Sequence, residues 1–256
     1  MPSKRLWTKE ELILAFNLYL KIPFGKTHST NKDIIHLANL IDRTPSSVAL
    51  RLANFASVDP VLQARGIKGM DGGKKIVQPI WNEFFNNQEE LIFLSEKILA
   101  EKENTSIEKK YDIQDLKGED ILRMVKTRVN QSVFRQMVLS NYNNKCAITG
   151  IDIPELLLAS HIIPWSKNEE HRLNPENGIC FSALYDKAFD KGLIGINTNH
   201  EIIFSDSIKK KKETEFYSKY FSSFENQKII AAQKYIPRKE FLEYHLDTVF
   251  NKQPIL

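Results

Sequence analysis

The chain has 256 residues, with 36 Lys and Arg against 32 Asp and Glu, and a formal net charge of +4. Its 42% hydrophobic and 27% charged residues are typical of a globular protein and exclude a disordered or fibrous one. Two cysteines, Cys146 and Cys180, are too few to staple a secreted fold of this size. No apolar run reaches about 18 residues and the N-terminus lacks an apolar signal core, so we expect a cytoplasmic protein without a membrane partner.

Charge and glycine are unevenly distributed along the chain. Residues 1–60 carry a balance of +3 and residues 205–240 a balance of +4, so the remainder is slightly negative. Residues 101–120 are charged and poor in large apolar side chains, which is typical of a linker. We therefore expect an α+β protein with a helical domain over 1–100, a linker over 101–120 and a second domain over 121–256.

Three helices are predicted in the first 56 residues. Thr8 and Glu11 have the spacing of a capping box, which predicts that a helix begins there. A second helix is predicted from about Asn31 to Ile41, where apolar residues recur at helical spacing. Thr44 then caps a third helix, whose first position holds Pro45.

The segment over about 31–56 has a helix–turn–helix pattern, and the strings WTKEEL and RTPSSVALRL resemble a Myb-like three-helix module. In such modules the third helix enters the DNA major groove. The resemblance therefore implies that Arg51 and Asn54 read guanine and adenine edges. The residues of this region expected to contact DNA are Arg43, Ser46, Ser47, Arg51 and Asn54. The alternative is three packed helices with a solvated polar face.

Two further basic stretches are candidates for phosphate contacts. Residues 63–76 contain four of the ten glycines together with Lys74 and Lys75, which indicates a flexible basic loop. The run Lys209, Lys210 and Lys211 is the second candidate. Each stretch is equally compatible with an ordinary solvated surface.

The stretch 145–196 has the order strand, loop, strand, helix. The strands are predicted over Leu156–Ile163 and Ile179–Ser182, and the helix over Ala183–Lys191, ended by Gly192. The strings ASHIIPW, RLNPENGI and LYDKAFDKGLI resemble the HNH endonuclease family with its ββα-metal fold, and more narrowly its restriction-type branch. Flanking strings extend the resemblance over about 121–250.

This resemblance implies a role for each matching residue. His161 is expected to be the general base, and Asn177 to hold the loop and orient His161. Asp186 and Asp190, one helical turn apart, are expected to bind one Mg²⁺ or Mn²⁺ per active site, because carboxylates suit hard cations.

Two positions depart from the family pattern. Ser160 stands where a metal ligand is common and is a poor ligand, and Tyr185 stands where a histidine is usual. Tyr185 either contacts a phosphate or, as we favour, packs and positions the site. Only Cys146 remains of the cysteine pairs with which some members bind structural zinc, so no structural zinc is expected.

The sequence thus favours a metal-dependent endonuclease that cuts double-stranded DNA, leaving 5′-phosphate and 3′-hydroxyl ends. The resemblance further implies restriction of foreign DNA in a prokaryote, and one active site per strand implies a homodimer. One alternative is a non-catalytic helix–turn–helix regulator with a degenerate HNH core. Another is an RNA-directed nuclease, although the narrow A-form major groove does not admit a helix.

Overall fold

The computed structural model describes residues 5–112 and 119–252. The chain divides into two compact units, Met1–Met137 (unit 1) and Val138–Leu256 (unit 2), and each is described by itself. Within the described ranges, no helix is both long and apolar enough to cross a membrane.

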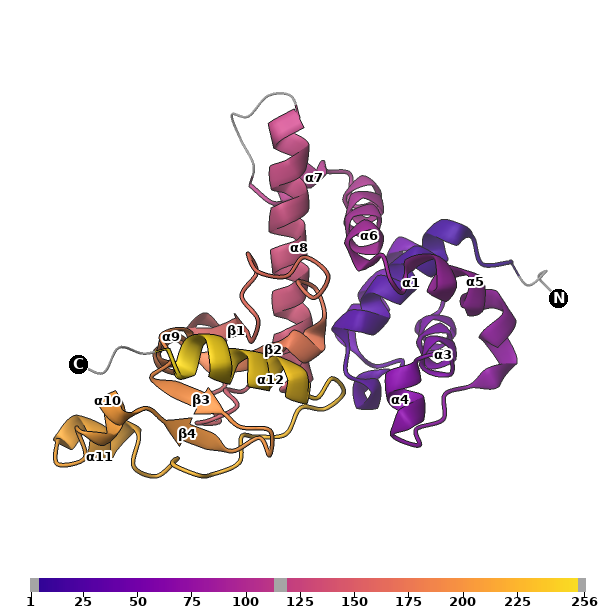
Figure 1. Ribbon diagram of the computed structural model, residues 1–256. Helices are drawn as coiled ribbons and strands as arrows, with labels where there is room; N and C mark the ends of the chain where they lie inside the picture. The colour runs from indigo at the N-terminus through magenta and orange to yellow at the C-terminus, as the bar shows by residue number, and fades with distance from the viewer. Residues whose placement is uncertain (1–4, 113–118, 253–256) are drawn as a thin grey trace. The chain divides into compact units, whose positions relative to one another are not determined.

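Unit 1 is helical (Figure 1). Its helices are α1 (Lys9–Lys21), α2 (Lys32–Leu40), α3 (Pro45–Ala56), α4 (Pro60–Ala64), α5 (Lys74–Phe84), α6 (Gln88–Lys102), α7 (Ile107–Lys110) and most of α8 (Glu119–Asn141), with short 3-10 turns η1 (Phe24–Lys26) and η2 (Asp71–Gly73). Helix α1 contacts α2, α3, α5 and α6 and so lies at the centre of the core. There the Phe16 ring stacks on Phe55 at 4.7 Å and on Trp81 at 5.0 Å.

The three predicted helix starts are confirmed by their caps. The Thr8 side chain accepts from the Glu11 N–H, and the Glu11 carboxylate accepts from the Thr8 N–H, which completes the capping box. Asn31 caps α2, and Thr44 caps α3 in front of Pro45. These local signals set the helix boundaries because each cap satisfies N–H groups that the helix itself leaves unpaired.

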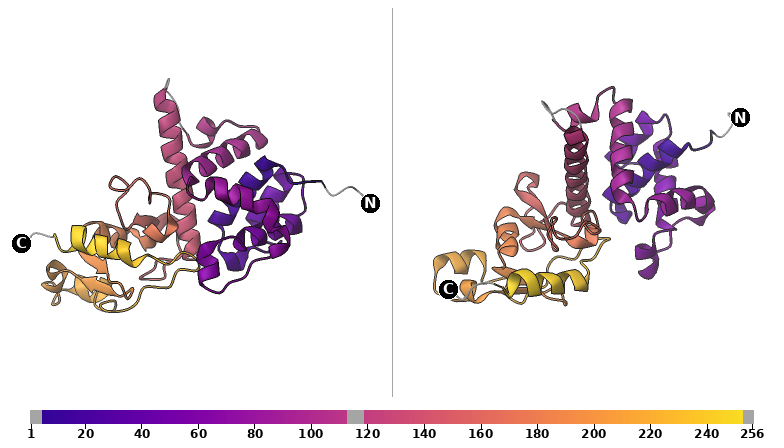
Figure 2. Two further views of the ribbon diagram at one scale, coloured as in Figure 1. Left: turned by 45° about the vertical axis from the view of Figure 1, so that its right-hand side comes forward. Right: turned by 45° about the horizontal axis from the view of Figure 1, so that its top comes forward.

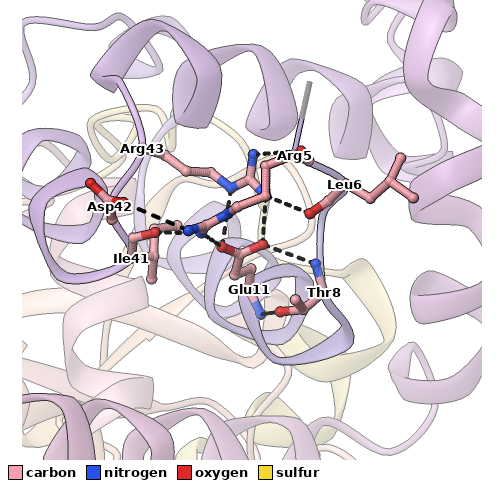
Figure 3. A network of polar contacts seen from close by, with 7 residues as sticks. All are labelled: Arg5, Leu6, Thr8, Glu11, Ile41, Asp42 and Arg43. Carbon is pink, nitrogen blue, oxygen red and sulfur yellow. Dashed lines mark hydrogen bonds and ion pairs between the residues drawn. The ribbon is translucent and has the colours of Figure 1, made fainter. Parts of the chain in front are cut away.

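The carboxylate of Glu11 is also the centre of a buried ionic network (Figure 3). It is 4% exposed and accepts hydrogen bonds from Arg5 and from Nε and Nη2 of Arg43, at 3.1 and 2.8 Å for the latter two. Burial by itself raises the pKa of Glu11. The hydrogen bonds from Arg43, Thr8 and Arg5 outweigh that effect, so the pKa lies below its ordinary value.

The glycine-rich stretch 63–76 was predicted as a flexible loop, and that prediction is wrong for much of it. Helix α4 ends at Ala64, η2 covers Asp71–Gly73 and α5 begins at Lys74. The segment also packs against α3, because a Cβ on Gly69 would lie 2.2 Å from the backbone nitrogen of Ser57.

The boundary between the units differs from the predicted 1–100 and 121–256 division, because it falls inside α8. Part of the expected linker, 101–120, packs on unit 1. Buried Glu96 on α6 accepts hydrogen bonds from Lys21 and Tyr111 and lies 3.4 Å from Nζ of Lys110. The start of α8 also joins unit 1, since the Lys126 ammonium lies 4.9 Å from the Phe93 ring centroid. Residues 113–118 of the expected linker lie outside the described residues.

Unit 2 combines short helices with two small antiparallel sheets. Strands β1 (Leu157–His161) and β2 (Gly178–Ser182) form the first sheet, and β3 (Ile194–Ile196) and β4 (Ile202–Phe204) the second. The helices of this unit are α9 (Ala183–Asp190), α10 (Asp206–Lys209), α11 (Glu215–Tyr220) and α12 (Lys239–His245), with 3-10 turns η3 (Pro154–Leu156) and η4 (Pro175–Asn177) and the π-helical turn η5 (Leu246–Phe250). Helix α9 packs on β1 and β2, and both views of Figure 2 show α10 and α11 beside the β3–β4 hairpin. The mixture of helices and small sheets is the α+β class that was predicted.

The Glu11 network generates a stability prediction. Glu11→Gln removes the charge that balances Arg43, so we expect unfolding of unit 1 to become easier by about 3 kcal/mol at pH 7. Because the folded pKa is lowered, the contribution of Glu11 is complete above its ordinary pKa of 4.5 and is lost as the pH falls through the folded value. Urea denaturation at pH 7 and pH 3 therefore should show a difference that shrinks in acid.

Glu10→Gln is the matched control for this prediction, since Glu10 is an exposed neighbour in the same helical turn. It should change stability by less than about 0.5 kcal/mol. Equal effects of the two substitutions at pH 7 would contradict the role given to Glu11.

Candidate active site

His161 is the last residue of β1, at the end of the first sheet where the connecting loop joins its two strands. It lies opposite Gly178, and the register runs back to Leu157 opposite Ser182. The chain between the two strands, residues 162–177, leaves directly after His161 and returns directly before Gly178. The hairpin therefore fixes the backbone of His161 and presents its ring beside this connecting loop.

The loop holds the His161 ring in one tautomer. Nε2 of His161 lies 2.9 Å from the backbone oxygen of Arg172. Because a carbonyl oxygen only accepts hydrogen bonds, Nε2 carries the hydrogen, and the lone pair of the neutral ring is on Nδ1. The edge of the ring also meets Trp165 at 5.5 Å between centroids, and the Arg172 guanidinium lies 5.4 Å from the same Trp165 ring.

Burial lowers the pKa of His161 below its ordinary value of 6.5, and the hydrogen bond to Arg172 only partly opposes this shift. At neutral pH the ring is therefore neutral. A neutral imidazole with its lone pair on Nδ1 is the form that accepts a proton from water.

Asn177 ties both ends of the loop together. Its Oδ1 accepts from the Ile163 N–H at 2.8 Å, and its Nδ2 donates to the backbone oxygens of Ile163 and His171 at 3.1 and 3.2 Å. Its own backbone oxygen accepts from Ile162 at 2.9 Å. Asn177 is 1% exposed. Its hydrogen bonds hold Ile162 and Ile163, which follow His161, and His171, which precedes Arg172.

Asp186 lies in the first turn of α9 and is bound to the strand that carries His161. The Ser160 hydroxyl donates a hydrogen bond to Oδ1 of Asp186. Ser160 is 3% exposed, so its side chain supports Asp186 from inside the fold. The hydrogen bond places the carboxylate next to the end of β1, one residue before His161.

Asp190 lies one helical turn after Asp186. Although the residue is exposed as a whole, desolvation of its carboxylate and then the charge of Asp186 raise its pKa above the ordinary value. Two carboxylates that disfavour each other's charge are relieved by a cation. Their oxygens also suit Mg²⁺ or Mn²⁺ by type, so the donors present fit such an ion.

The described residues contain no group of three or more His, Cys, Asp and Glu side chains that could hold a metal ion. An ion on Asp186 and Asp190 would therefore complete its coordination with water or substrate oxygens, which is common for Mg²⁺.

Tyr185 packs inside unit 2, which is the role that the sequence analysis favoured over a phosphate contact. It is 4% exposed, donates a hydrogen bond to the backbone oxygen of Tyr220, and meets the rings of Phe221 and Phe224 at 5.9 and 5.8 Å. Burial raises its pKa to about 12, so the phenol stays protonated. The hydrogen bond joins α9 to the end of α11.

His245 fixes the other end of α9. Its ring stacks on Phe189 at 3.7 Å, its Nε2 lies 3.0 Å from the Phe189 backbone oxygen, and burial lowers its pKa to about 4. Together with Tyr185, this contact holds the helix that carries Asp186 and Asp190.

The side chains predicted to read bases in unit 1 are in the wrong place for that role. Arg51 and Asn54 are 7% and 2% exposed, and Nη1 of Arg51 donates to Oδ1 of Asn54 at 3.1 Å. Asn54 in turn donates to the backbone oxygen of Met70 at 2.7 Å, because the segment before α5 covers this face of α3. Arg43 forms an ion pair with Glu11, and the Arg43 side chain is 9% exposed.

The remaining candidates for DNA contact lie at the surface. Ser46, Lys74, Lys75, Lys209, Lys210 and Lys211 are exposed, and Ser47 is partly exposed. Lys74 and Lys75 belong to the first turn of α5, and the Lys209–Lys211 run lies at the end of α10. Lys209 lies 3.8 Å from Glu225, a partner that the charge count along the chain did not show.

Sequence reasoning missed Trp165 and the backbone oxygen of Arg172 as parts of the His161 environment. Trp165 closes the string ASHIIPW, and a large aromatic residue four positions after a candidate base is a signal that was present. The role of the Arg172 carbonyl could not be predicted, because every residue has a backbone carbonyl and the sequence does not single one out.

Comparison with known proteins bears on the same segment. No curated protein matched the chain. Residues 146–197, which run from Cys146 through β1, β2 and α9 to the end of β3, match the model of a family described as HNH endonuclease. The match contains His161, Asn177 and Asp186, and it supports the assignment of this segment of unit 2 to the HNH endonucleases.

Proposed function

We propose that the protein is a metal-dependent HNH endonuclease that hydrolyses phosphodiester bonds of double-stranded DNA. The observation that carries this proposal is the half-buried, neutral His161, whose Nε2 is bound to the Arg172 carbonyl and whose lone pair is therefore on Nδ1. The family match over 146–197 supports the reaction class. As the biological role we propose restriction of foreign DNA by a homodimer, in which each active site cuts one strand.

In the proposed reaction, Nδ1 of His161 accepts a proton from water as the water oxygen forms a bond to phosphorus. The bond from phosphorus to the 3′ oxygen breaks, and that oxygen is protonated, which leaves 5′-phosphate and 3′-hydroxyl ends. Asp186 and Asp190 would hold Mg²⁺ or Mn²⁺, which supplies charge relief to the phosphate and the leaving oxygen. Ser160 orients Asp186, and Asn177 maintains the loop that orients His161.

One observation favours a second candidate, a non-catalytic DNA-binding regulator with a degenerate core. Tyr185 is packed and Ser160 is engaged with Asp186, so neither adds a conventional metal ligand. Catalysis then depends on only two carboxylates. A plasmid-nicking assay with Mg²⁺, Mn²⁺ or no metal separates the two functions, because a regulator leaves the plasmid intact in every case.

His161→Ala is the most direct test of the proposed reaction. Without the base we expect nicking to fall by at least about 100-fold, while binding of duplex DNA is kept. The measurement pairs plasmid nicking in Mg²⁺ with fluorescence anisotropy of a labelled duplex. His200→Asn is the control, since His200 lies in the β3–β4 turn at φ 63°, which asparagine tolerates. If His161→Ala cuts at the rate of the unsubstituted protein, His161 is not the base.

The pH dependence of cleavage follows from the environment of His161. Because its pKa is lowered, the group is a competent base down to a pH below 6.5. We expect the acid limb of kcat/KM against pH to have its midpoint below that value. The midpoint can be measured under single-turnover conditions with a short duplex and checked by NMR titration of the His161 ring. An acid limb centred above 6.5 would contradict a neutral base with a lowered pKa.

Asn177→Asp tests the loop. The substitution keeps the shape and the acceptor but removes the two N–H donors that bind Ile163 and His171, and it places a carboxylate against two carbonyl oxygens. We expect cleavage to fall by at least about tenfold and the protein to unfold about 2 kcal/mol more easily. Asn168→Asp is the matched control in the same loop. The Asn168 side chain accepts a hydrogen bond from the His171 N–H through its oxygen, and aspartate keeps that acceptor.

A further inference from the structure

Arg51 is a buried cation for which the described residues supply no ion-pair partner. Its residue is 7% exposed, yet Nη1 donates to the neutral amide of Asn54 and the guanidinium carbon lies 4.8 Å from the Trp7 ring centroid. Nε is buried and has no hydrogen-bond partner within the described part of the chain. A charge removed from water without a counter-ion is unfavourable, so this arrangement favours any anion that can reach it.

Arg43 lies on the same Trp7 ring as Arg51 but has a carboxylate partner. Its guanidinium carbon lies 4.3 Å from the same Trp7 ring, but it is paired with Glu11. Burial and then the neighbouring charge of Arg43 lower the pKa of Arg51. Of the two guanidinium groups on Trp7, Arg51 is thus the one left with unbalanced charge.

The N-terminus of α5 lies directly beside Arg51. This helix of 11 residues begins after Gly73, and no side chain caps its first turn. A Cβ on Gly73 would lie 2.9 Å from Nη1 of Arg51 and 2.1 Å from Oδ1 of Asn54, so the glycine lets α3 and the start of α5 approach each other. The Lys74 N–H already donates to the backbone oxygen of Asp71 in η2. The positive end of the helix dipole nevertheless meets the unbalanced guanidinium.

We propose that Arg51 and the first turn of α5 bind a backbone phosphate of duplex DNA. The proposal rests on the proposed function for the identity of the anion. A polymeric anion is favoured over a small one because three exposed lysines lie on the two sides of Gly73 and outnumber the exposed Asp71 of η2: Lys68, Lys74 and Lys75. Arg51 then positions DNA on unit 1 without reading a base edge, in contrast to the role implied by the Myb-like resemblance.

The test measures DNA binding by the full chain carrying His161→Ala, so that the duplex stays intact. Arg51→Met keeps the apolar stem and removes the charge, while Lys97→Gln removes one exposed charge of α6 as the matched control. We expect Arg51→Met to weaken binding of a labelled duplex about tenfold and to lower the salt slope by about one phosphate contact. Lys97→Gln should weaken it less than about twofold.

A second measurement does not depend on nuclease activity. In thermal unfolding, inorganic phosphate should raise the Tm of the unsubstituted protein and have less effect on Arg51→Met, whose Tm without phosphate should be no lower, since the lost charge was unbalanced. If Arg51→Met does not fold, Arg51→Lys replaces it. Lysine keeps the charge without the planar fork, so binding should be weakened to a smaller extent.

The outcomes separate the two proposals. If Arg51→Met binds DNA like Lys97→Gln, or gains as much from phosphate as the unsubstituted protein, the phosphate site is overturned and the nuclease assignment stands. If the unsubstituted protein neither binds nor cuts DNA, the proposed function fails. A phosphate effect that is then still lost in Arg51→Met keeps an anion site but overturns DNA as its occupant.

Discussion

The candidate active site depends on the side chain of one buried residue, Asn177. Its amide satisfies the N–H and the carbonyl of Ile163, at the start of the 162–177 loop, and a second carbonyl at His171, inside the same loop. His161 lies two residues before Ile163, and Arg172, whose carbonyl binds the His161 ring, directly follows His171. An apolar side chain at position 177 would leave three backbone groups unpaired inside the protein, and the partner of the His161 ring would move with them.

A charge imbalance that bears on the proposed function is found among the described residues of each unit. In unit 1 it is positive, since Arg51 is buried against Trp7 and Asn54 while its neighbour Arg43 already has Glu11. In unit 2 it is negative, since desolvation and then the charge of Asp186 raise the pKa of Asp190 on the same helix. A nucleic acid phosphate suits the first imbalance and a divalent cation the second, and a metal-dependent nuclease needs both.

The features that were predictable from sequence are those that local chemistry decides. The capping residue Thr8 and the strand–loop–strand–helix order of 145–196 needed no knowledge of distant contacts. The predicted strand Leu156–Ile163 was too long, because Ile163 bonds to the Asn177 side chain instead of to a neighbouring strand. The burial of Arg51 was not predictable, since it arises from η2, which follows α3 by more than a dozen residues and returns to cover it. The same holds for the boundary inside α8, because α8 contacts Phe93 of α6 through Lys126 and the carbonyls of Tyr111 and Asp112 through Arg128.

The polar framework of unit 2 argues against a core that has only decayed. Buried polar groups are unfavourable unless every partner is supplied, so a scaffold without chemistry gains nothing from orienting an imidazole through a loop carbonyl. Yet the His161 tautomer is fixed, and Ser160 holds Asp186 at the end of the same strand. Helix α9 is fastened at both ends, by Tyr185 through Tyr220 and by His245 through Phe189. Tyr185 thus contributes rigidity to helix α9. In the proposed reaction, the two aspartates of this helix would hold the metal ion.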